Sequence, residues 1–453
     1  MQKIDFQEFL QKDRECSCKK VHRCDIETIL ISRDALQKVP ELIKQQEYQK
    51  ICIIEDNNTK QVAGDLLEKI LKEQDIFPKR ICFDDVFLIP DEAALGRIIT
   101  EIDRETDLIL AVGSGTLNDL CKFISYQLKM DYYIIATAPS MDGYASNVAP
   151  LISNHAKVTY EVSMPRAIIG DLSILKEAPM NMIAAGVGDV LGKYVCLMDW
   201  KMSHIVTGEY YCTEVVKLVE QAIDKVMQGT DKLALRDEDA ILSIMEGLIL
   251  SGIGMSYIGN SRPASGSEHH LSHYWEMMAL LSNGHIELHG TKVAIGTVIG
   301  LRLYEKFFQD LGIADSYHAF QSAEPEFHPE QWSAEIRRVY LGAADSVIAL
   351  ENTSKKNAPE EMKRRKEALL NQRDLLQIEV KKLPKADQII KILKLLSAKS
   401  TPEEVGVSEE TLRDSILYAK ELRNRFGILQ VLKDFGLQDA YAEEIIEYFR
   451  SVK

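Results

Sequence analysis

The sequence predicts an N-terminal α/β domain with a parallel sheet, followed by an all-helical C-terminal domain. In the first third of the chain, strand-like apolar runs alternate with helical apolar spacing, which is typical of a parallel sheet covered on both faces. After Ala178-Pro179 the spacing is helical almost throughout. A chain of 453 residues is also too long for one core. We therefore place the domains at 1–178 and 179–453.

The individual elements follow from the local patterns, in chain order. Buried strands are predicted at 26–32, 48–56, 79–85, 107–115 and 131–139, and helices at 61–74, 91–102 and 117–130. A hairpin is expected over residues 156–170. The mixed-charge segment 354–374 predicts a solvated helix face or an exposed helical hairpin. Two or three closing helices are expected after Pro402.

Composition limits the possible partners. Hydrophobic residues make up 46% of the chain and charged residues 27%, which is typical of a soluble globular protein. The net charge of −15 argues against nucleic acid or an anionic membrane as the main partner. The N-terminal segment has no apolar signal-like region, and no run approaches the ~18 apolar residues of a membrane span. We expect a cytoplasmic enzyme whose site is locally basic if its substrate is an anion.

Cysteine usage agrees with a reducing compartment. A disulfide framework is not expected among the eight cysteines of a large chain without a signal peptide. Cys16, Cys18 and Cys24 cluster around His22, and this group could bind a metal. It lacks the paired CxxC spacing of a strong zinc motif, so reduced surface or interface thiols are the favoured interpretation.

Half of the ten histidines fall in one short window. The window forms two i,i+4 pairs, His269/His273 and His285/His289, and each pair would share one helix face. His270 lies between them, and Asp189 sits upstream in the glycine-framed segment GVGDVLGKY. Two imidazoles and one carboxylate suit a first-row metal and leave a fourth position for water or substrate. The pattern therefore predicts a catalytic metal site.

A glycine turn predicts a nucleotide site in the first domain. Gly113-Ser-Gly-Thr116 follows a buried strand and opens a helix, where backbone N–H groups can meet a phosphate. The turn is not GxGxxG, and the strand-end acid, Asp56, precedes the glycines instead of following them. An acid there would bind an adenosine ribose and repel a 2′-phosphate, which favours NAD over NADP. An ordinary tight turn is the alternative interpretation.

The loop after the next strand is the second candidate for ligand binding. Ligands bind at the carboxyl ends of parallel strands. Thr137, Ser140 and Ser146 offer hydroxyl groups there, and Asp142 offers a carboxylate. An Asx-type turn with capping serines would explain the same residues without any ligand.

Five motifs in this order make the chain resemble a known family. They are GSGTLND (113–119), TAPSMDGYAS (137–146), GVGDVLGKY (186–194), RPASGSEHHLSH (262–273) and HGTKVAIGT (289–297). Over about residues 25–310 the chain resembles the sn-glycerol-1-phosphate dehydrogenases, within the superfamily of iron-dependent alcohol dehydrogenases, glycerol dehydrogenase and dehydroquinate synthase. The resemblance implies a dehydroquinate synthase-like fold, with a Rossmann-like NAD-binding domain, a helical domain and one divalent metal.

The resemblance also implies roles for individual residues. Asp189, His269 and His289 match the metal ligands, with His285 as the alternative to His289, and the metal could be zinc, nickel or iron. His273 matches a substrate contact and, with Asp142 and Lys193, forms the predicted catalytic set. Arg262 and Lys292 are further candidates for a substrate phosphate, and His270 has no role. The expected cofactor-binding residues are Asp56, Gly113, Ser114, Gly115, Thr116, Leu117, Asn118, Asp119, Thr137, Ser140 and Ser146.

The activity implied is the reversible, NAD(P)H-linked reduction of dihydroxyacetone phosphate to sn-glycerol 1-phosphate, which would serve lipid biosynthesis. A homodimer or higher homo-oligomer is expected. Three alternatives stay open. They are a glycerol or other polyol dehydrogenase, a dehydroquinate synthase-type lyase that regenerates its NAD within each turnover, and a catalytically silent nucleotide-binding protein.

Overall fold

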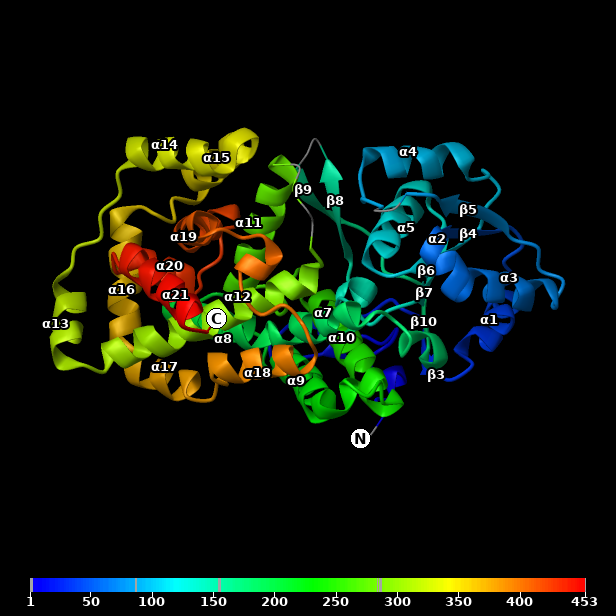
Figure 1. Ribbon diagram of the computed structural model, residues 1–453, viewed down its shortest axis with the longest axis horizontal. Helices are drawn as coiled ribbons and strands as arrows, with labels where there is room; N and C mark the ends of the chain where they lie inside the picture. The colour runs from blue at the N-terminus through cyan, green and yellow to red at the C-terminus, as the bar shows by residue number, and fades with distance from the viewer. Residues whose placement is uncertain (1–2, 86–87, 154–155, 283, 285–286, 453) are drawn as a thin grey trace. The chain divides into compact units, whose positions relative to one another are not determined.

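The computed structural model describes residues 3–85, 88–153, 156–282, 284 and 287–452, and the chain forms two compact units (Figure 1). Unit 1 comprises Met1–Val190 and Thr213–Ser261, and unit 2 comprises Leu191–Cys212 and Arg262–Lys453. The single boundary predicted at residue 178 differs from this division, because the chain returns to unit 1 after first leaving it. Local periodicity does not reveal such a return.

Unit 1 is built on a six-stranded sheet in the order β3-β10-β7-β6-β4-β5, and every neighbouring pair is parallel. The predicted parallel α/β sheet is thus confirmed. The strands are β3 (Thr28–Ser32), β4 (Ile51–Asp56), β5 (Lys79–Phe83), β6 (Leu108–Gly113), β7 (Asp131–Ala136) and β10 (Ala167–Asp171).

Helices cover both faces of this sheet, which explains why its strands read as continuous apolar runs. Alternate residues of β4, β6, β7 and β10 pack with α1 (Val39–Gln45) and α3 (Asp65–Lys72) in one buried cluster. The side chains of the residues in between point to the other face of the sheet. There α5 (Gly115–Leu128) contacts β6 and β7, and α4 (Glu92–Glu101) packs on α5.

The hairpin predicted at 156–170 is wrong in its position. The antiparallel pair is β8 (Val148–Ser153) with β9 (Ala156–Glu161). Residues 167–171 instead form β10, which inserts into the main sheet between β3 and β7. All five residues of β10 are buried, as a central parallel strand requires. A second, two-residue pairing joins β1 (Arg14–Glu15) to β2 (Val21–His22).

Four helices complete unit 1 after the sheet, namely α6 (Leu172–Leu175), α7 (Met180–Leu191), α9 (Thr213–Leu233) and α10 (Glu238–Ile258). In length and composition α10 could cross a membrane, with a mean hydropathy of 1.6, but 78% of its apolar window is buried. It packs along α9, and Lys225 Nζ of α9 bonds Glu246 Oε2 of α10 at 2.6 Å. Such burial is typical of the core helix of a soluble protein.

Unit 2 is helical throughout its described residues. Its helices are α8 (Lys193–Thr207), α11 (Ser267–Leu281), α12 (His289–Leu311), α13 (Ala314–Ser322), α14 (Pro329–Tyr340), α15 (Ala344–Ser354), α16 (Pro359–Asn371), α17 (Arg373–Val380), α18 (Ala386–Leu395), α19 (Glu409–Tyr418), α20 (Ile428–Asp434) and α21 (Gln438–Val452). The closing helices expected after Pro402 are α19, α20 and α21.

A buried carboxylate, Asp199 of α8, ties several of these helices together. It accepts hydrogen bonds from Tyr304 Oη at 2.5 Å, from the Ser267 N–H at 2.7 Å and from the Ile428 N–H at 2.9 Å. These donors come from α12, from the start of α11 and from the start of α20. The C-terminal tail is therefore bonded into the core that carries the histidine helices.

The mixed-charge segment 354–374 is not simply a solvated face. Within it, Arg365 of α16 is buried, and its guanidinium makes a bidentate pair with Asp434 of α20, with both N···O distances 2.7 Å. Planar Arg–carboxylate pairs of this kind survive burial because both charges are satisfied. Charge content alone does not distinguish such a face from an exposed one.

A second buried network holds the tail at Glu421. Lys356 Nζ and Lys420 Nζ each lie 3.1 Å from its carboxylate, and Asn357 Nδ2 donates to it as well. Burial alone would raise the pKa of Glu421, but the charges of Lys420 and Lys356, with their hydrogen bonds, lower it to about 2. Glu421 is therefore ionised in the folded protein at all ordinary pH values.

We expect Glu421→Gln to destabilise the protein by about 3 kcal/mol at pH 7, because it leaves two buried lysines without their countercharge. The folded pKa lies below the unfolded value of about 4.3. The carboxylate's contribution is therefore complete above that value and disappears as the pH falls towards about 2. Urea unfolding of both proteins between pH 7 and pH 3 measures the difference.

The matched control is Glu409→Gln, which breaks an exposed pair with Arg450. Exposed pairs contribute about 1 kcal/mol or less, so this variant should unfold close to wild type. Equal destabilisation by the two substitutions would contradict the ionised, buried role assigned to Glu421.

Candidate functional site

The carboxyl edge of the sheet in unit 1 brings the predicted nucleotide residues together. From β4 the chain adds β5 on one side, and it then crosses back to add β6, β7 and β10 in turn on the other side. The carboxyl ends of the neighbouring strands β4 and β6 therefore form a topological switch point, where open α/β sheets bind ligands. Asp56 ends β4 and Gly113 ends β6, level with Ala136 at the end of β7.

The glycine turn leads directly into α5. Ser114 is the N-cap residue and makes no side-chain cap hydrogen bond, and residues 114–116 are partly exposed. A Cβ on Gly113 would lie 2.5 Å from Leu117 Cδ1, so the turn packs too tightly for a side chain there. The exposed first turn of a 14-residue helix can receive an anion. The side chain of Asp119, in contrast, is occupied by Asn118 and Lys122.

Asp56 has a structural task as well as its position at the sheet edge. Its Oδ1 accepts the N–H groups of Asn58 at 2.9 Å and Thr59 at 2.8 Å, which caps the short helix α2 (Asn57–Thr59). A ribose hydroxyl would therefore bond to the second carboxylate oxygen.

The loop 137–146 is held by a buried lysine that the sequence interpretation overlooked. Lys122 Nζ of α5 donates to the carbonyl groups of Gly143 at 2.7 Å and Val148 at 3.0 Å, and to Ser146 Oγ at 3.1 Å. The Ser146 hydroxyl therefore forms part of the loop's own hydrogen bonding. Thr137 and Ser140 are buried in the same loop. Burial lowers the pKa of Lys122.

Asp189 is fully buried on α7, against this loop. Its Oδ2 accepts the backbone N–H of Asp142 at 3.0 Å, and Asp142 Oδ2 accepts the hydroxyl of Ser251 at 2.8 Å. A Cβ on Gly186, one helical turn before Asp189, would lie 1.9 Å from the carbonyl oxygen of Pro139. Because Gly186 has no side chain, α7 lies close to the loop. The backbone N–H of Asp142 in that loop can therefore orient the Asp189 carboxylate.

Three imidazoles converge in unit 2. His269 and His273 lie on α11, as their spacing predicts, with ring centroids 5.8 Å apart. His289 begins α12, and its ring lies 5.2 Å from that of His269 and 5.5 Å from that of His273. The second predicted pair, His285/His289, stays a prediction, because His285 lies outside the described residues.

A carboxylate supports each of the two predicted histidine ligands. His269 Nδ1 bonds Glu268 Oε1 at 2.6 Å, and His289 Nδ1 bonds Glu276 Oε1 at 2.8 Å. Since a carboxylate accepts, each Nδ1 carries the proton, and Nε2 is the basic nitrogen. This is the carboxylate–histidine arrangement that orients imidazoles towards a metal. The donor set therefore fits a divalent metal.

The predicted basic residues lie inside unit 2 and are bonded there. Arg262 makes a bidentate pair with Glu209, with bonds of 2.9 and 3.0 Å, and also donates to the carbonyl of Phe426 in the tail. Lys292 Nζ lies 3.2 Å from Glu276 Oε1. Lys193 is fully buried at the start of α8 and donates to the carbonyl of Ala264 at 3.1 Å. Arg262 therefore anchors the tail helices.

His270 belongs to the core. It is buried on α11, and its Nε2 has no hydrogen-bond partner. Burial and the nearby positive charges of Arg425 and Arg423 lower its pKa well below the ordinary value, so the ring is neutral.

The two supporting glutamates are functional candidates that the sequence interpretation missed. Glu268 precedes His269 directly, and Glu276 lies one helical turn after His273. Acidic residues at those offsets are common on helix surfaces, and only burial distinguishes these two, with Glu268 0% and Glu276 6% exposed.

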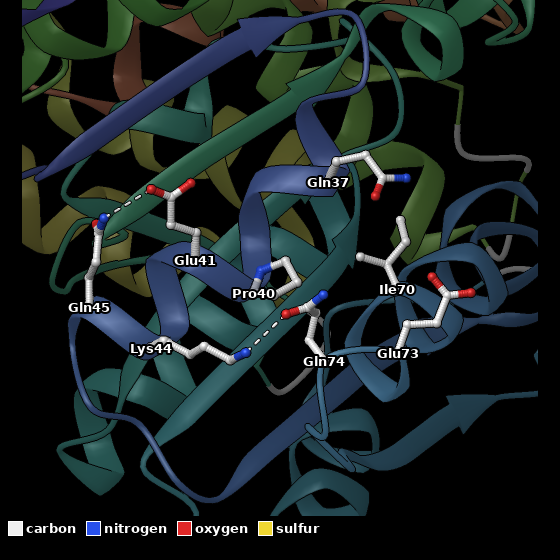
Figure 2. A pocket seen from close by; sticks show the side chains of 8 residues that line it. All are labelled: Gln37, Pro40, Glu41, Lys44, Gln45, Ile70, Glu73 and Gln74. Atoms are coloured by element: carbon white, nitrogen blue, oxygen red, sulfur yellow. Dashed lines mark hydrogen bonds between the residues drawn. The ribbon is translucent and has the colours of Figure 1, made fainter.

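A surface hollow of about 520 Å³ on unit 1 lies apart from these residues. As Figure 2 shows, its walls come from η2 (Ala35–Lys38), α1 and the end of α3. Its side chains bond one another, with Lys44 Nζ donating to Gln74 Oε1 at 3.0 Å and Gln45 Nε2 to Glu41 Oε1 at 3.3 Å. None of the predicted site residues lines it, and we assign it no function.

Comparison with known sequences identifies relatives over most of the chain. A family model of iron-containing alcohol dehydrogenases matches residues 30–179. The glycerol-1-phosphate dehydrogenase (NAD(P)+) of Bacillus licheniformis is 32% identical over 427 residues, which cover 93% of this chain and 92% of the relative. The one of Halalkalibacterium halodurans is 38% identical over 295 residues, covering 64% and 74%. The one of Pyrococcus furiosus is 31% identical over 276 residues, covering 60% and 76%.

Solved structures share the fold at low sequence identity. Glycerol dehydrogenase from Schizosaccharomyces pombe matches with a TM-score of 0.60 and 14% identity, covering 93% of this chain and 91% of that one. NADH-dependent butanol dehydrogenase A from Thermotoga maritima matches with a TM-score of 0.58 and 14% identity, covering 95% and 100%. At this level of identity the comparison establishes the architecture alone.

Proposed function

The chain belongs to the glycerol-1-phosphate dehydrogenases, among the iron-containing alcohol dehydrogenases, and we propose that it reversibly reduces dihydroxyacetone phosphate to sn-glycerol 1-phosphate with NAD(P)H. The observation that carries this proposal is the pair of carboxylate-supported imidazoles, His269 with Glu268 and His289 with Glu276. Relatives of the same enzyme name over nearly the full chain support the substrate.

For the metal we propose Asp189, His269 and His289 as ligands. In unit 1, the Asp142 N–H orients the buried Asp189 carboxylate. In unit 2, the carboxylates behind the imidazoles fix the tautomer that presents Nε2 as a donor. A divalent metal held there would supply Lewis-acid polarisation of the ketone oxygen. Zinc, nickel and iron all accept this ligand set.

For the nucleotide we propose the switch point between β4 and β6. The first turn of α5 would receive the diphosphate through the N–H groups of residues 115–117, aided by the helix dipole. Asp56, already fixed as the cap of α2, would bond the adenosine ribose and disfavour a 2′-phosphate. Bound NAD(P)H supplies the hydride, and the protein positions it.

For the substrate we propose His273 and Asp142 as the groups that orient its hydroxyl oxygens. His273 lies beside both proposed histidine ligands, with centroids 5.8 Å from His269 and 5.5 Å from His289. From that position it can hold or donate the proton that the alkoxide oxygen needs. Lys193 is our candidate for the substrate phosphate. We further propose that the enzyme is cytoplasmic, homodimeric and active in lipid biosynthesis.

The deciding experiment is NADH oxidation by the purified, metal-supplemented protein with dihydroxyacetone phosphate or dihydroxyacetone, followed by chiral analysis of the product. We expect steady NADH consumption with the phosphorylated ketone and formation of the sn-1 product. Preference for dihydroxyacetone would indicate a polyol dehydrogenase. Absence of net NADH consumption with either ketone would contradict the proposal.

Glu276→Gln tests the supporting shell of the metal. The amide oxygen of glutamine carries no negative charge, so its hydrogen bond from His289 Nδ1–H is weaker than that of the carboxylate. We therefore expect metal affinity to fall 10–100-fold. Saturating metal should restore most of the activity. Titration with zinc or nickel, followed by an activity assay, measures both effects. The control is Glu305→Gln on the same helix as His289, at a partly exposed surface position. Unchanged metal affinity in Glu276→Gln would contradict the supporting role.

A further inference from the structure

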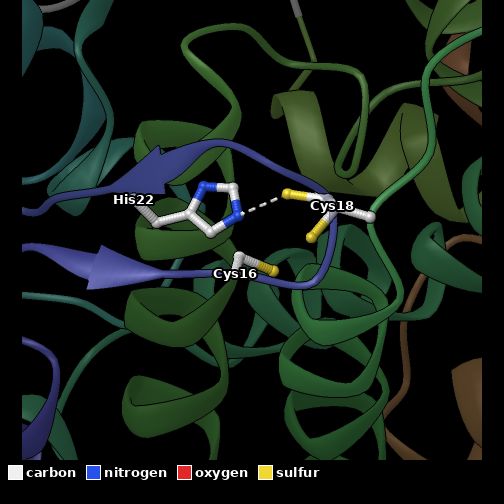
Figure 3. A group of neighbouring side chains, drawn as sticks. Cys16, Cys18 and His22 are labelled. Carbon is white, nitrogen blue, oxygen red and sulfur yellow. Dashed lines mark hydrogen bonds between the residues drawn. The ribbon is translucent and has the colours of Figure 1, made fainter.

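The N-terminal hairpin of unit 1 brings together three side chains of metal-binding types. None of them belongs to the proposed nucleotide site or catalytic metal site. Cys16, Cys18 and His22 lie on and between β1 and β2, and their side chains converge (Figure 3). Their ligand atoms all lie within 4.8 Å of one another, and Cys18 Sγ is 3.3 Å from His22 Nε2. In a tetrahedral zinc site, sulfur and nitrogen ligands are about 3.6 Å apart. The group is thus close to ligand spacing without any rearrangement of the hairpin.

The histidine is oriented as a metal ligand would be. His22 Nδ1 bonds the backbone carbonyl of Tyr257 at 2.8 Å, and since a carbonyl only accepts, Nδ1 carries the proton. Nε2 then has the lone pair and points to Cys18. The imidazole also stacks on the Tyr257 ring, with centroids 5.4 Å apart and planes 16° apart. A second bond to a backbone carbonyl is the usual support of a ligating histidine.

Cys212, which lies directly before α9, is the candidate for a fourth ligand. A hollow of about 460 Å³ beside the hairpin is lined by Cys16 and His22 together with Glu214 and Lys217 of α9. Cys212 precedes Glu214 by two residues, so chain geometry limits the distance between their Cα atoms to about 7 Å. The start of α9 therefore carries a thiol at the end of the helix that faces this hairpin.

We propose that Cys16, Cys18, His22 and Cys212 form a structural zinc site. Three thiolates and one imidazole are a complete tetrahedral donor set for zinc and leave no open position for chemistry. The metal would fasten the short β1–β2 hairpin to the start of α9, in addition to its two-residue strand pairing and the bond from His22 to Tyr257. Its binding energy would then add directly to folding.

The remaining cysteine of the cluster is not part of the site. Cys24 is fully buried, and its Sγ is not among the ligand atoms that converge around His22. All eight cysteines are present as thiols, which zinc binding requires. The sequence pattern favours ordinary thiols here because the spacing lacks CxxC. A local motif could not reveal the proposed fourth ligand, Cys212, because it lies nearly two hundred residues later in the chain.

The test compares zinc content in a background that lacks the proposed catalytic site. His289→Ala protein, purified with zinc and passed through gel filtration, should retain about one zinc per chain, measured by mass spectrometry. Adding Cys16→Ser and Cys18→Ser should remove it. Adding Cys82→Ser, a partly exposed cysteine elsewhere in unit 1, should not. If the variant with Cys16→Ser and Cys18→Ser held as much zinc as the variant with Cys82→Ser, the proposal would be overturned.

Cobalt substitution provides a readout in the unmodified protein. Cobalt(II) bound by thiolates shows intense sulfur-to-metal charge-transfer absorption, whereas the proposed catalytic ligands contain no sulfur. We expect this absorption in the wild type and in His289→Ala, a weaker absorption in Cys212→Ser, and its loss when Cys16 and Cys18 are both replaced by serine. A folded, cobalt-loaded wild type without the absorption would overturn the site. Because this signal does not depend on turnover, an inactive enzyme would leave the zinc proposal standing.

Discussion

His289→Ala is expected to abolish glycerol-phosphate oxidation and ketone reduction. The substitution removes one of three proposed ligands and leaves Glu276 and Lys292 facing a space that the imidazole filled. Loss of Lewis-acid polarisation, worth several kcal/mol, corresponds to about a 10³-fold or greater fall in kcat/KM. Stoichiometric metal binding at this site should disappear as well. Steady-state kinetics and metal analysis after gel filtration measure the two effects.

NAD binding should persist in this variant, because the proposed nucleotide residues lie on the sheet of unit 1. Fluorescence titration with NADH checks this. His318→Ala, at an exposed position on α13, is the histidine control and should behave as wild type. Normal turnover of His289→Ala would rule out His289 as a ligand and leave His285 as the candidate.

Gly186→Ala is expected to damage both stability and activity. Its Cβ would lie 1.9 Å from the Pro139 carbonyl oxygen, so α7 and the loop 137–146 must separate. The movement would break the bond between the Asp142 N–H and Asp189. We expect a net loss of about 2 kcal/mol, after the gain of about 1 kcal/mol that alanine brings to a helix. Displacement of a proposed ligand by about 1 Å should lower kcat/KM by about 10²-fold.

Gly96→Ala is the matched control, since Gly96 is also helical. Apart from its chain neighbours and the backbone of its own helix, no atom lies within 4 Å of the Cβ it would gain on α4. This variant should be more stable than wild type by about 0.5–1 kcal/mol, with unchanged kinetics. Thermal unfolding of both variants separates steric conflict from helix propensity. If Gly186→Ala were as stable and active as wild type, the close approach of α7 to the loop would not be needed.

Several predictions could be made from the sequence because they depend on local patterns. Alternating apolar runs and turns predicted the parallel sheet, and i,i+4 spacing placed His269 and His273 on one face of α11. The wrong predictions involve residues whose environment comes from elsewhere in the chain. Residues 167–170 were predicted as part of a hairpin, but they belong to β10, whose partners β3 and β7 lie far away in sequence.

The residues that support the site were invisible for the same reason. Glu276, Lys122 and Asp199 belong to residue types that are usually solvated, and a sequence gives no measure of their burial. Each becomes significant only because helices pack around it and leave a charge that needs a partner. Arg262 shows the opposite case, since a predicted phosphate contact turned out to be paired with Glu209 and bonded to the tail.

The sequence by itself thus determined the fold class, the family and the order of the motifs, because periodicity and motif residues are properties of short segments. Only the tertiary structure decided where the units divide, which carboxylates stand behind His269 and His289, and which of the clustered thiols converge on His22. Burial, hydrogen-bond partners and ligand spacing arise from contacts between distant segments. Those contacts form when the chain packs, and no local pattern encodes them.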